Sequence, residues 1–180
     1  MIINRGFKDF KFRHRSKKNQ IIYTSKKVKN EDDVLNLIDN FLVEKNSFIF
    51  ESVEKGKIKG RYTIIGLNPD KIWDINKNKI SIKTKRSTKV IKKDPLVYLN
   101  NLTNKFKIKI PKNLPSMSSM LVGYFSYDVI RYLEKIPDKC INDLKIPDVR
   151  LMRPKNLVIY DNFKKKIHFI ENFFSDIPVK

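Results

Sequence analysis

The sequence predicts an α+β fold, a mostly antiparallel sheet with flanking helices. Apolar runs of strand length recur from residue 20 to residue 171 and are separated by turn residues. Helical patterns between them are few and isolated, whereas a parallel sheet needs a crossover helix after most strands. Hydrophobic residues make up 41% of the 180 residues, which is enough for one packed domain.

The N-terminus differs from the rest of the chain. Residues 1–19 are basic and show no sustained apolar period, so we expect a basic arm followed by one domain over residues 20–180. The arm lacks the apolar segment of a signal peptide. The apolar run QIIYT, residues 20–24, predicts an edge strand.

Two helices have clear start signals. Asn30 precedes three acidic residues, a cap followed by charges that favour a helix N-terminus, and predicts a helix to about Glu44. Asp94 and Pro95 predict a second start, since Pro is well tolerated at the first helical position. Apolar residues then recur at helical spacing in both segments.

Four strands are predicted between these helices, over residues 47–53, 61–67, 71–75 and 79–85. The segment INKNKI between the last two predicts a tight hairpin. In the last strand Ile80 and Ile82 alternate with polar residues, so one face should contact water.

The second half of the chain predicts further strands and one short helix. Its elements are a loop at 111–119, a buried strand at 120–125, a short helix after 126, and a strand pair at 157–161 and 166–171. Gly123 permits close approach of another backbone in the buried strand, and Ser126 is placed to cap the helix.

The formal net charge is +20, from 39 Lys and Arg against 19 Asp and Glu. Such a charge can indicate nucleic-acid binding. However, alanine is absent and Lys, Ile and Asn dominate, as in the translation of an AT-rich coding sequence. We therefore interpret the lysines as a generic solvated surface. The best polyanion candidate, KTKRSTKVIKK at 83–93, has no aromatic residue on which a base could stack.

No catalytic or metal-binding motif stands out. The sequence has no Gly-rich phosphate loop, and neither His14 nor His168 has a partner at metal-ligand spacing. Cys140, the single cysteine, has no activating neighbour in sequence and indicates a reducing, cytoplasmic setting. No run of about 18 apolar residues predicts a membrane segment. We expect no catalytic residue, metal ligand or cofactor in this chain.

One polar pair interrupts an apolar strand. Phe48, Ile49 and Phe50 make the strand apolar on both faces, and Glu51 and Ser52 follow directly. In extended geometry Ser52 continues the face of Phe48 and Phe50, and Glu51 continues the other. A carboxylate and a hydroxyl in this position need partners, which are either structural groups or a ligand.

Four segments occur in the order and spacing of a known family. They are Glu51-Ser52 after an apolar pair, GRYTIIGLNP at 60–69, GYFSYD at 123–128 and MRPKNLVIYD at 152–161. With QIIYT they span most of residues 20–172. On these segments the chain closely resembles the N-terminal region of anthranilate synthase component I, the chorismate-using subunit of the first committed step in tryptophan synthesis.

The resemblance implies an α/β sandwich to which the N- and C-terminal regions of the enzyme both contribute. Family members are longer, and their C-terminal chorismate-binding domain carries the Mg²⁺ ligands and the catalytic groups. We therefore expect a fragment of a longer enzyme that is inactive alone. Its implied partners are that C-terminal domain and component II, the glutamine amidotransferase subunit that supplies ammonia.

The resemblance also implies a role for the polar pair. In the family the matching Glu-Ser pair lines the feedback site for L-tryptophan. Glu51 would balance the ligand's ammonium, directly or through a network, and Ser52 would hydrogen-bond it while nearby Phe or Ile side chains pack the indole. The structural alternative pairs Glu51 with a Lys or Arg and Ser52 with a neighbouring strand. We interpret the GYFSYD aromatics as core and domain-interface packing.

Two other functions stay open. Para-aminobenzoate synthase component I is a close relative with the same architecture, although ESVEKGKIKGRYTIIGLNP is nearer to the anthranilate branch. A basic module that binds RNA or DNA would need Lys and Arg gathered on one face with aromatic residues between them.

Overall fold

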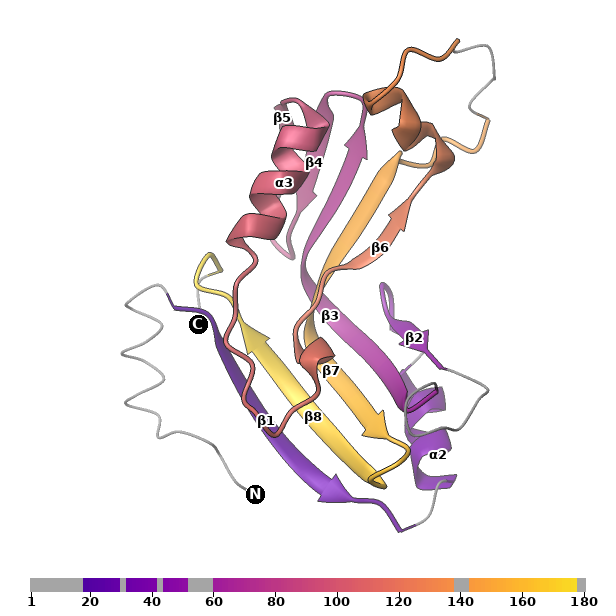
Figure 1. Cartoon of the computed structure of the whole chain (residues 1–180), viewed down its shortest axis with the longest axis vertical. Helices are drawn as coiled ribbons and strands as arrows, with labels where there is room; N and C mark the ends of the chain where they lie inside the picture. The colour runs from indigo at the N-terminus through magenta and orange to yellow at the C-terminus, as the bar shows by residue number, and fades with distance from the viewer. Residues whose placement is uncertain (1–17, 30–31, 42–43, 52–59, 138–142, 178–180) are drawn as a thin grey trace. The chain divides into compact units, whose positions relative to one another are not determined.

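The computed structural model describes residues 18–29, 32–41, 44–51, 60–137 and 143–177 (Figure 1). The chain forms two compact units. The first comprises residues 1–69, 108–120 and 154–180, and the second comprises residues 70–107 and 121–153. Two long strands, β3 (Tyr62–Asn76) and β7 (Val149–Asp161), contribute residues to both units.

Strand pairing follows the order β1-β8-β7-β3-β4-β5, with β2 added to β3 and β6 added to β7. The remaining strands are β1 (Gln20–Lys27), β2 (Phe48–Phe50), β4 (Lys79–Lys83), β5 (Thr88–Lys92), β6 (Val122–Phe125) and β8 (Lys166–Phe173). The pairs β1–β8, β2–β3, β3–β4, β4–β5, β6–β7 and β7–β8 are antiparallel. The predicted α+β fold with a mostly antiparallel sheet is therefore confirmed.

In the first unit the sheet buries apolar side chains on both faces. Helix α2 (Asp32–Phe41) packs Val34 and Ile38 against Ile65 of β3. The preceding residue, Ile64, points to the opposite face of the sheet and packs against Leu114. Leu114 belongs to the segment that contains the short 3-10 helix η1 (Ser116–Ser118). The strands of this unit are thus covered on both sides, which explains their nearly continuous apolar sequence.

In the second unit helix α3 (Pro95–Lys105) covers the core. Its residues Tyr98, Leu99 and Leu102 pack against a buried cluster that includes Trp73 and Ile80. The Trp73 indole N–H donates to the Tyr98 hydroxyl at 3.0 Å, so this aromatic pair is joined by a hydrogen bond as well as by packing. The short 3-10 helix η2 (Tyr127–Tyr132) follows β6.

Two bidentate ion pairs join residues of β3, or next to it, to residues of β7. In the first unit Arg61 donates to both oxygens of Asp161 at 3.0 and 2.7 Å. In the second unit Arg153 donates to both oxygens of Asp70 at 2.7 and 2.9 Å, and both side chains are buried. In each pair a carboxylate accepts two hydrogen bonds from one guanidinium, which makes the interaction strong and directional.

Several predicted elements have different bounds. The strands predicted at 61–67 and 71–75 are one strand, β3, since Asn68 accommodates its positive φ of 51° without ending the strand. The strand predicted at 157–161 begins earlier, at Val149. The helix predicted from Asn30 is seen as α2, and the strand predicted at 47–53 is seen only as β2; their flanking residues 30–31, 42–43 and 52–59 lie outside the described part of the chain.

One strand was missed, and one prediction of burial was wrong. Strand β5 (Thr88–Lys92) was not predicted, because its lysines hide the alternation that marks a strand. The strand predicted as buried at 120–125 is β6, in which Gly123, Tyr124 and Phe125 are exposed. Ser126 lies at the start of η2 as expected, but its side chain makes no capping hydrogen bond.

Candidate functional site

Glu51, one of the two predicted ligand residues, directly follows β2 in the first unit and is exposed. Ser52, the other, lies outside the residues that the structure describes. The structure therefore describes the strands next to the predicted site, which are β2 and the part of β3 that pairs with it.

Two aromatic rings lie together on β2. Phe48 and Phe50 lie on one side of β2, with ring centroids 4.9 Å apart and tilted by 45°. Phe48 pairs with Gly66 of β3, and a Cβ at that position would overlap the Phe48 ring. The glycine thus makes room for the inner ring, while the outer ring of Phe50 keeps 49% of its surface exposed.

The opposite side of β2 is structural. Ile49 packs against the cluster under α2, so β2 is held by its apolar side chains as well as by its pairing with β3. Within the described residues β2 pairs with no strand other than β3. Within the described residues, the exposed residue Glu51 thus directly follows an edge strand whose last residue, Phe50, has a half-exposed ring.

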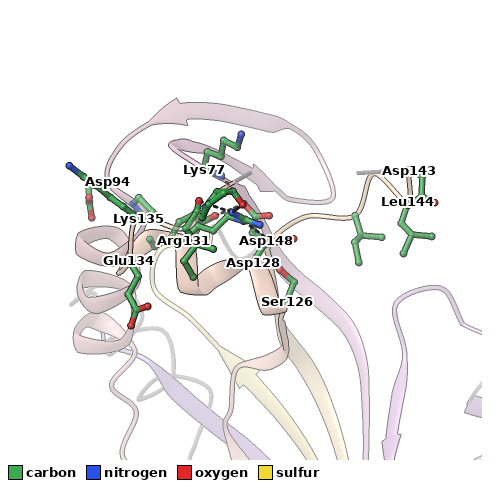
Figure 2. Close-up of a pocket in the computed structure, with 15 residues that line it drawn as sticks. Lys77, Asp94, Ser126, Asp128, Arg131, Glu134, Lys135, Asp143, Leu144 and Asp148 are labelled. Carbon is green, nitrogen blue, oxygen red and sulfur yellow. Dashed lines mark hydrogen bonds and ion pairs between the residues drawn. The ribbon is translucent and has the colours of Figure 1, made fainter. Parts of the chain in front are cut away.

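A pocket of about 880 Å³ lies in the second unit (Figure 2). Its lining combines acidic, basic and apolar side chains. The acidic residues are Asp94, Asp128, Glu134, Asp143 and Asp148, the basic ones are Lys77, Arg131 and Lys135, and the apolar ones are Pro95, Ile136, Pro137, Leu144 and Ile146. Ser126 and Tyr132 complete it.

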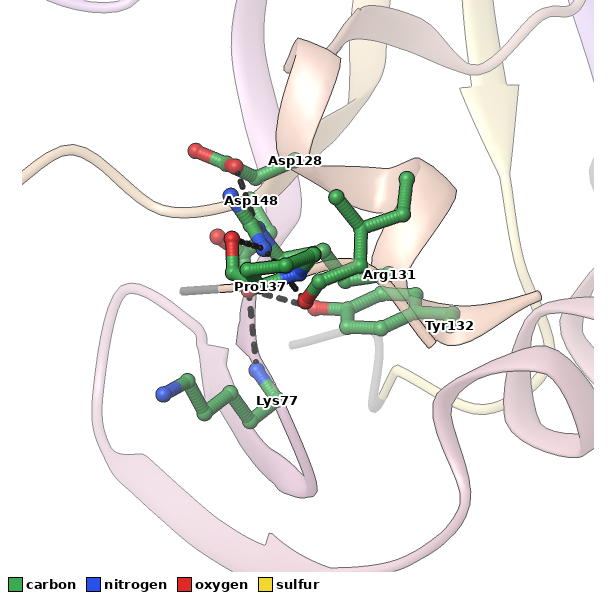
Figure 3. Close-up of polar contacts among 7 residues, drawn as sticks. Lys77, Asp128, Arg131, Tyr132, Pro137 and Asp148 are labelled. Atoms are coloured by element: carbon green, nitrogen blue, oxygen red, sulfur yellow. Dashed lines mark hydrogen bonds and ion pairs between the residues drawn. The ribbon is translucent and has the colours of Figure 1, made fainter. Parts of the chain in front are cut away.

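Asp148 organises one side of this pocket (Figure 3). Its Oδ2 accepts hydrogen bonds from the Tyr132 hydroxyl at 2.6 Å and from the backbone N–H of Lys77 at 2.9 Å. Burial raises the pKa of Tyr132, and the hydrogen bond to Asp148 raises it further. Tyr132 therefore stays protonated and serves as a hydrogen-bond donor, not as a base.

Arg131 forms a second set of polar contacts in the pocket lining. Its Nε donates to Asp128 at 2.7 Å, and its Nη1 donates to the backbone carbonyls of Ile136 and Pro137 at 3.0 and 2.9 Å (Figure 3). One guanidinium thus fixes η2 to the segment that follows it. Its partners are the chain's own groups, which indicates a structural role for this residue.

Among the described residues of the pocket, Tyr132, Asp148, Arg131 and Asp128 are engaged with one another or with the backbone. The Tyr132 proton and one Asp148 oxygen are used in mutual hydrogen bonds, and Arg131 neutralises Asp128. Among the described residues no group of three or more His, Cys, Asp or Glu side chains could hold a metal ion. Sequence reasoning did not find this pocket, and the only signal for it was the run of polar and aromatic residues that begins at GYFSYD.

His168, the one histidine that the structure describes, belongs to neither site. His168 is buried in β8, where its Nδ1 lies 2.8 Å from the Ser25 hydroxyl. His14 and Cys140 lie outside the described part of the chain. None of the helices in that part is long and apolar enough to cross a membrane.

Comparison with known proteins gives a consistent result, although no family model matches the sequence. The chain is 34% identical over 139 residues to anthranilate synthase component 1 of Acetivibrio thermocellus, covering 77% of this chain and 28% of the relative. The same protein of Cereibacter sphaeroides is 30% identical over 167 residues, covering 90% and 33%. That of Saccharomyces cerevisiae is 33% identical over 131 residues, covering 71% and 24%.

A solved structure agrees on the fold. Anthranilate synthase component I from Streptococcus pneumoniae TIGR4 superimposes with a TM-score of 0.51 at 24% identity, over 81% of this chain and 31% of that one. The chain spans about a third or less of the length of each of these four proteins. Its similarity extends over most of its own residues, and the chain belongs to the anthranilate synthase component I family as a homologue of the N-terminal region.

Proposed function

We propose that this chain is the regulatory and structural N-terminal domain of anthranilate synthase component I, and that it supplies part of an L-tryptophan feedback site through Glu51 and Ser52. The observation that carries the proposal is its similarity to curated members over 77% and 90% of its length. These relatives carry the anthranilate name, which favours that branch over para-aminobenzoate synthase component I.

The geometry at β2 supports the ligand role. L-Tryptophan carries an ammonium, a carboxylate and an indole. The exposed Glu51 carboxylate is suited to the ammonium, and the half-exposed Phe50 ring offers a surface on which an indole stacks. The hydroxyl of Ser52 both donates and accepts hydrogen bonds, so it fits either charged group of the ligand.

The complete enzyme would convert chorismate and ammonia to anthranilate, with ammonia supplied by a glutamine amidotransferase subunit and with Mg²⁺. The described residues contain no group of three or more His, Cys, Asp or Glu side chains that could hold a metal ion. On the family resemblance we assign the metal, the chorismate site and catalysis to a C-terminal chorismate-binding domain of the enzyme, and we propose a cytoplasmic location.

Anthranilate fluorescence tests this assignment. The full chain would be assayed alone with chorismate, Mg²⁺ and ammonia, and then after co-expression with the polypeptide that covers the unmatched part of the Acetivibrio thermocellus relative. We expect no turnover by the chain alone and tryptophan-sensitive turnover by the pair. Turnover by the chain alone above a heat-treated sample, or none by a co-purified pair, would contradict the proposal.

A further inference from the structure

Strand β5, in the second unit, has one open edge. It stands at the end of the strand order, and within the described residues it pairs only with β4. The backbone N–H of Lys93, just after β5, points toward β4, since it donates to the Asn78 carbonyl at 2.9 Å. Backbone groups of successive residues in an extended chain point to opposite sides, so those of Val90 and Lys92 are directed to the open edge. An unused row of this kind is a template for another strand.

The hairpin that ends in this edge carries charge of one sign. In the whole chain 39 basic residues accompany 19 acidic ones. Residues 75–93, which we name the basic hairpin, contain no acidic residue and eight basic ones: Lys77, Lys79, Lys83, Lys85, Arg86, Lys89, Lys92 and Lys93. Composition accounts for the number of lysines in the chain, whereas a segment without any carboxylate is a local feature.

Two of these lysines face each other across the basic hairpin. Lys79 of β4 and Lys92 of β5 are opposite in the strand register, and both are exposed. Among the residues that the structure describes, neither forms an ion pair with a carboxylate. Like charges in such a pair repel each other and destabilise the hairpin. A carboxylate beside both ammonium groups would offset this repulsion, so the hairpin favours an acidic ligand.

The side chains of β5 place an apolar group between the charges. Ile91 packs into the buried cluster under α3. Val90 and Lys92 therefore point to the other face of the sheet, where Val90 keeps 50% of its surface exposed. Lys89 shares the face of Ile91 but is exposed. The open edge thus has a lysine on each face and an exposed apolar side chain, which suits an extended peptide rich in acidic residues.

Two other occupants fit this edge less well. Residues 83–93 include no aromatic side chain on which a base could stack, and a phosphate backbone does not use the alternating N–H and C=O groups of a strand. A second copy of the chain would bring an edge of the same charge, and lysines on an edge strand oppose that pairing. The same lysines attract a strand of opposite charge, so they select the partner as well as protect the edge.

We propose that the open edge of β5 binds an extended, acidic segment of a partner protein by strand addition, and that Lys89 and Lys92 contact the carboxylates of that segment. The N–H and C=O groups of Val90 pair with the backbone of the added strand. This inference goes beyond the proposed function and does not depend on it, because the feedback site is assigned to residues of the first unit.

Fluorescence anisotropy with a labelled peptide, Glu-Glu-Thr-Val-Thr-Glu-Glu, tests the lysine contacts. The full chain is titrated at roughly 100 mM salt, where exposed charges more than about 10 Å apart are largely screened. The test variant is Lys89→Gln with Lys92→Gln. The matched control is Lys109→Gln with Lys112→Gln, which removes the same charge from two exposed lysines outside the basic hairpin. Circular dichroism of each variant checks that it is folded.

We expect the test variant to weaken peptide binding by about fivefold or more and the control by less than about twofold, since only the β5 lysines contact the ligand. An equal loss in the two variants would overturn the placement on β5. Absence of binding by the wild type would overturn the whole inference and leave the lysines as protection of the edge. An RNA or DNA oligonucleotide that binds more tightly than the peptide, and less tightly to the test variant, would also overturn it.

Proline substitutions on either side test the added strand. The peptide Glu-Glu-Pro-Val-Pro-Glu-Glu has the charge of the first peptide but lacks two backbone donors. In the chain, Val90→Pro removes the outward N–H at a strand edge, where proline is tolerated, and the control Val90→Thr keeps it. We expect each proline change to weaken binding by about threefold or more relative to its control. Equal binding in both comparisons would overturn strand addition.

Discussion

His168 is a buried histidine whose protonation opposes folding. Only 3% of its surface is exposed, and burial is the largest cause that lowers its pKa. Lys166 and Lys164 lower the pKa further, and Asp161 acts in the opposite direction. His168 therefore takes up a proton at a lower pH in the folded chain than in the unfolded chain, where the pKa of histidine is about 6.5.

This difference predicts a loss of stability in mild acid. Above about pH 6.5 His168 is neutral in both states, and below it the unfolded state gains a proton that the folded state resists. The free energy of unfolding should fall between pH 7.5 and pH 5.5 in wild type and in a His14→Asn control, and less steeply in His168→Asn. Urea titrations measure the free energy of unfolding at each pH. Equal slopes in all three proteins would contradict this account.

Gly66 is a second residue with a local physical requirement. Its missing Cβ leaves space for the Phe48 ring, which lies under the exposed ring of Phe50. We expect Gly66→Ala to destabilise the chain by about 1–3 kcal/mol, the usual cost of overpacking. Adding Phe48→Leu should restore part of the loss. If the double variant is less stable than Gly66→Ala alone in urea titrations, the clash is not the cause.

At the same scale the sequence predicts the two faces of β2 but not what surrounds them. The alternation around Phe48, Ile49 and Phe50 places the apolar faces correctly, because Ile49 packs under α2 and the two rings share the other side. The exposure of Phe50 could not be predicted, since it depends on which distant segments cover β2. The pocket around Asp148 was missed for the same reason, because two of the hydrogen bonds of Asp148 join it to residues 71 and 72 positions away in the sequence.

Helix α3 shows how well a local signal specifies an element. Asp94 accepts a hydrogen bond from the Val97 backbone N–H at 2.8 Å, and Pro95 begins the helix as predicted. We expect Asp94→Ala to cost about 1 kcal/mol of stability, since it removes the cap. Asn101→Ala, which removes an exposed side-chain contact within the same helix, should cost less. Thermal unfolding would show this, and equal costs would contradict the capping role.

Strands were harder to predict than this helix. The lysines of β5 and the aromatic residues of β6 follow no simple pattern of one wet and one buried face, because both strands are exposed over most of their length. The buried strand expected at 120–125 was inferred from its apolar residues alone. A run of apolar residues predicts a buried surface, but it does not say which part of this chain or which other polypeptide buries that surface.

The charge of the whole molecule bears on the rival function. Lysine-rich surfaces attract phosphates through counterion release, which is not sequence-specific. We therefore expect any RNA or DNA binding to weaken by about 100-fold or more between roughly 50 and 200 mM salt. Fluorescence anisotropy with unrelated oligonucleotides measures it. A sequence-selective complex that survives physiological salt would favour the nucleic-acid module.

The central claim is that this chain supplies part of a tryptophan feedback site, and the response of the co-expressed pair to L-tryptophan tests it most directly. A hydrogen bond from Ser52 to the ligand would contribute about 0.5–1.5 kcal/mol. Ser52→Ala should therefore raise the half-inhibitory tryptophan concentration by about threefold to tenfold.

Ser52→Phe should nearly abolish the inhibition, because the new ring competes with the indole for the same space. Turnover without tryptophan should stay unchanged in both variants. A Ser81→Ala control on β4 should behave as wild type. Inhibition that is the same in wild type and in both Ser52 variants would contradict the claim and return Ser52 to a structural role.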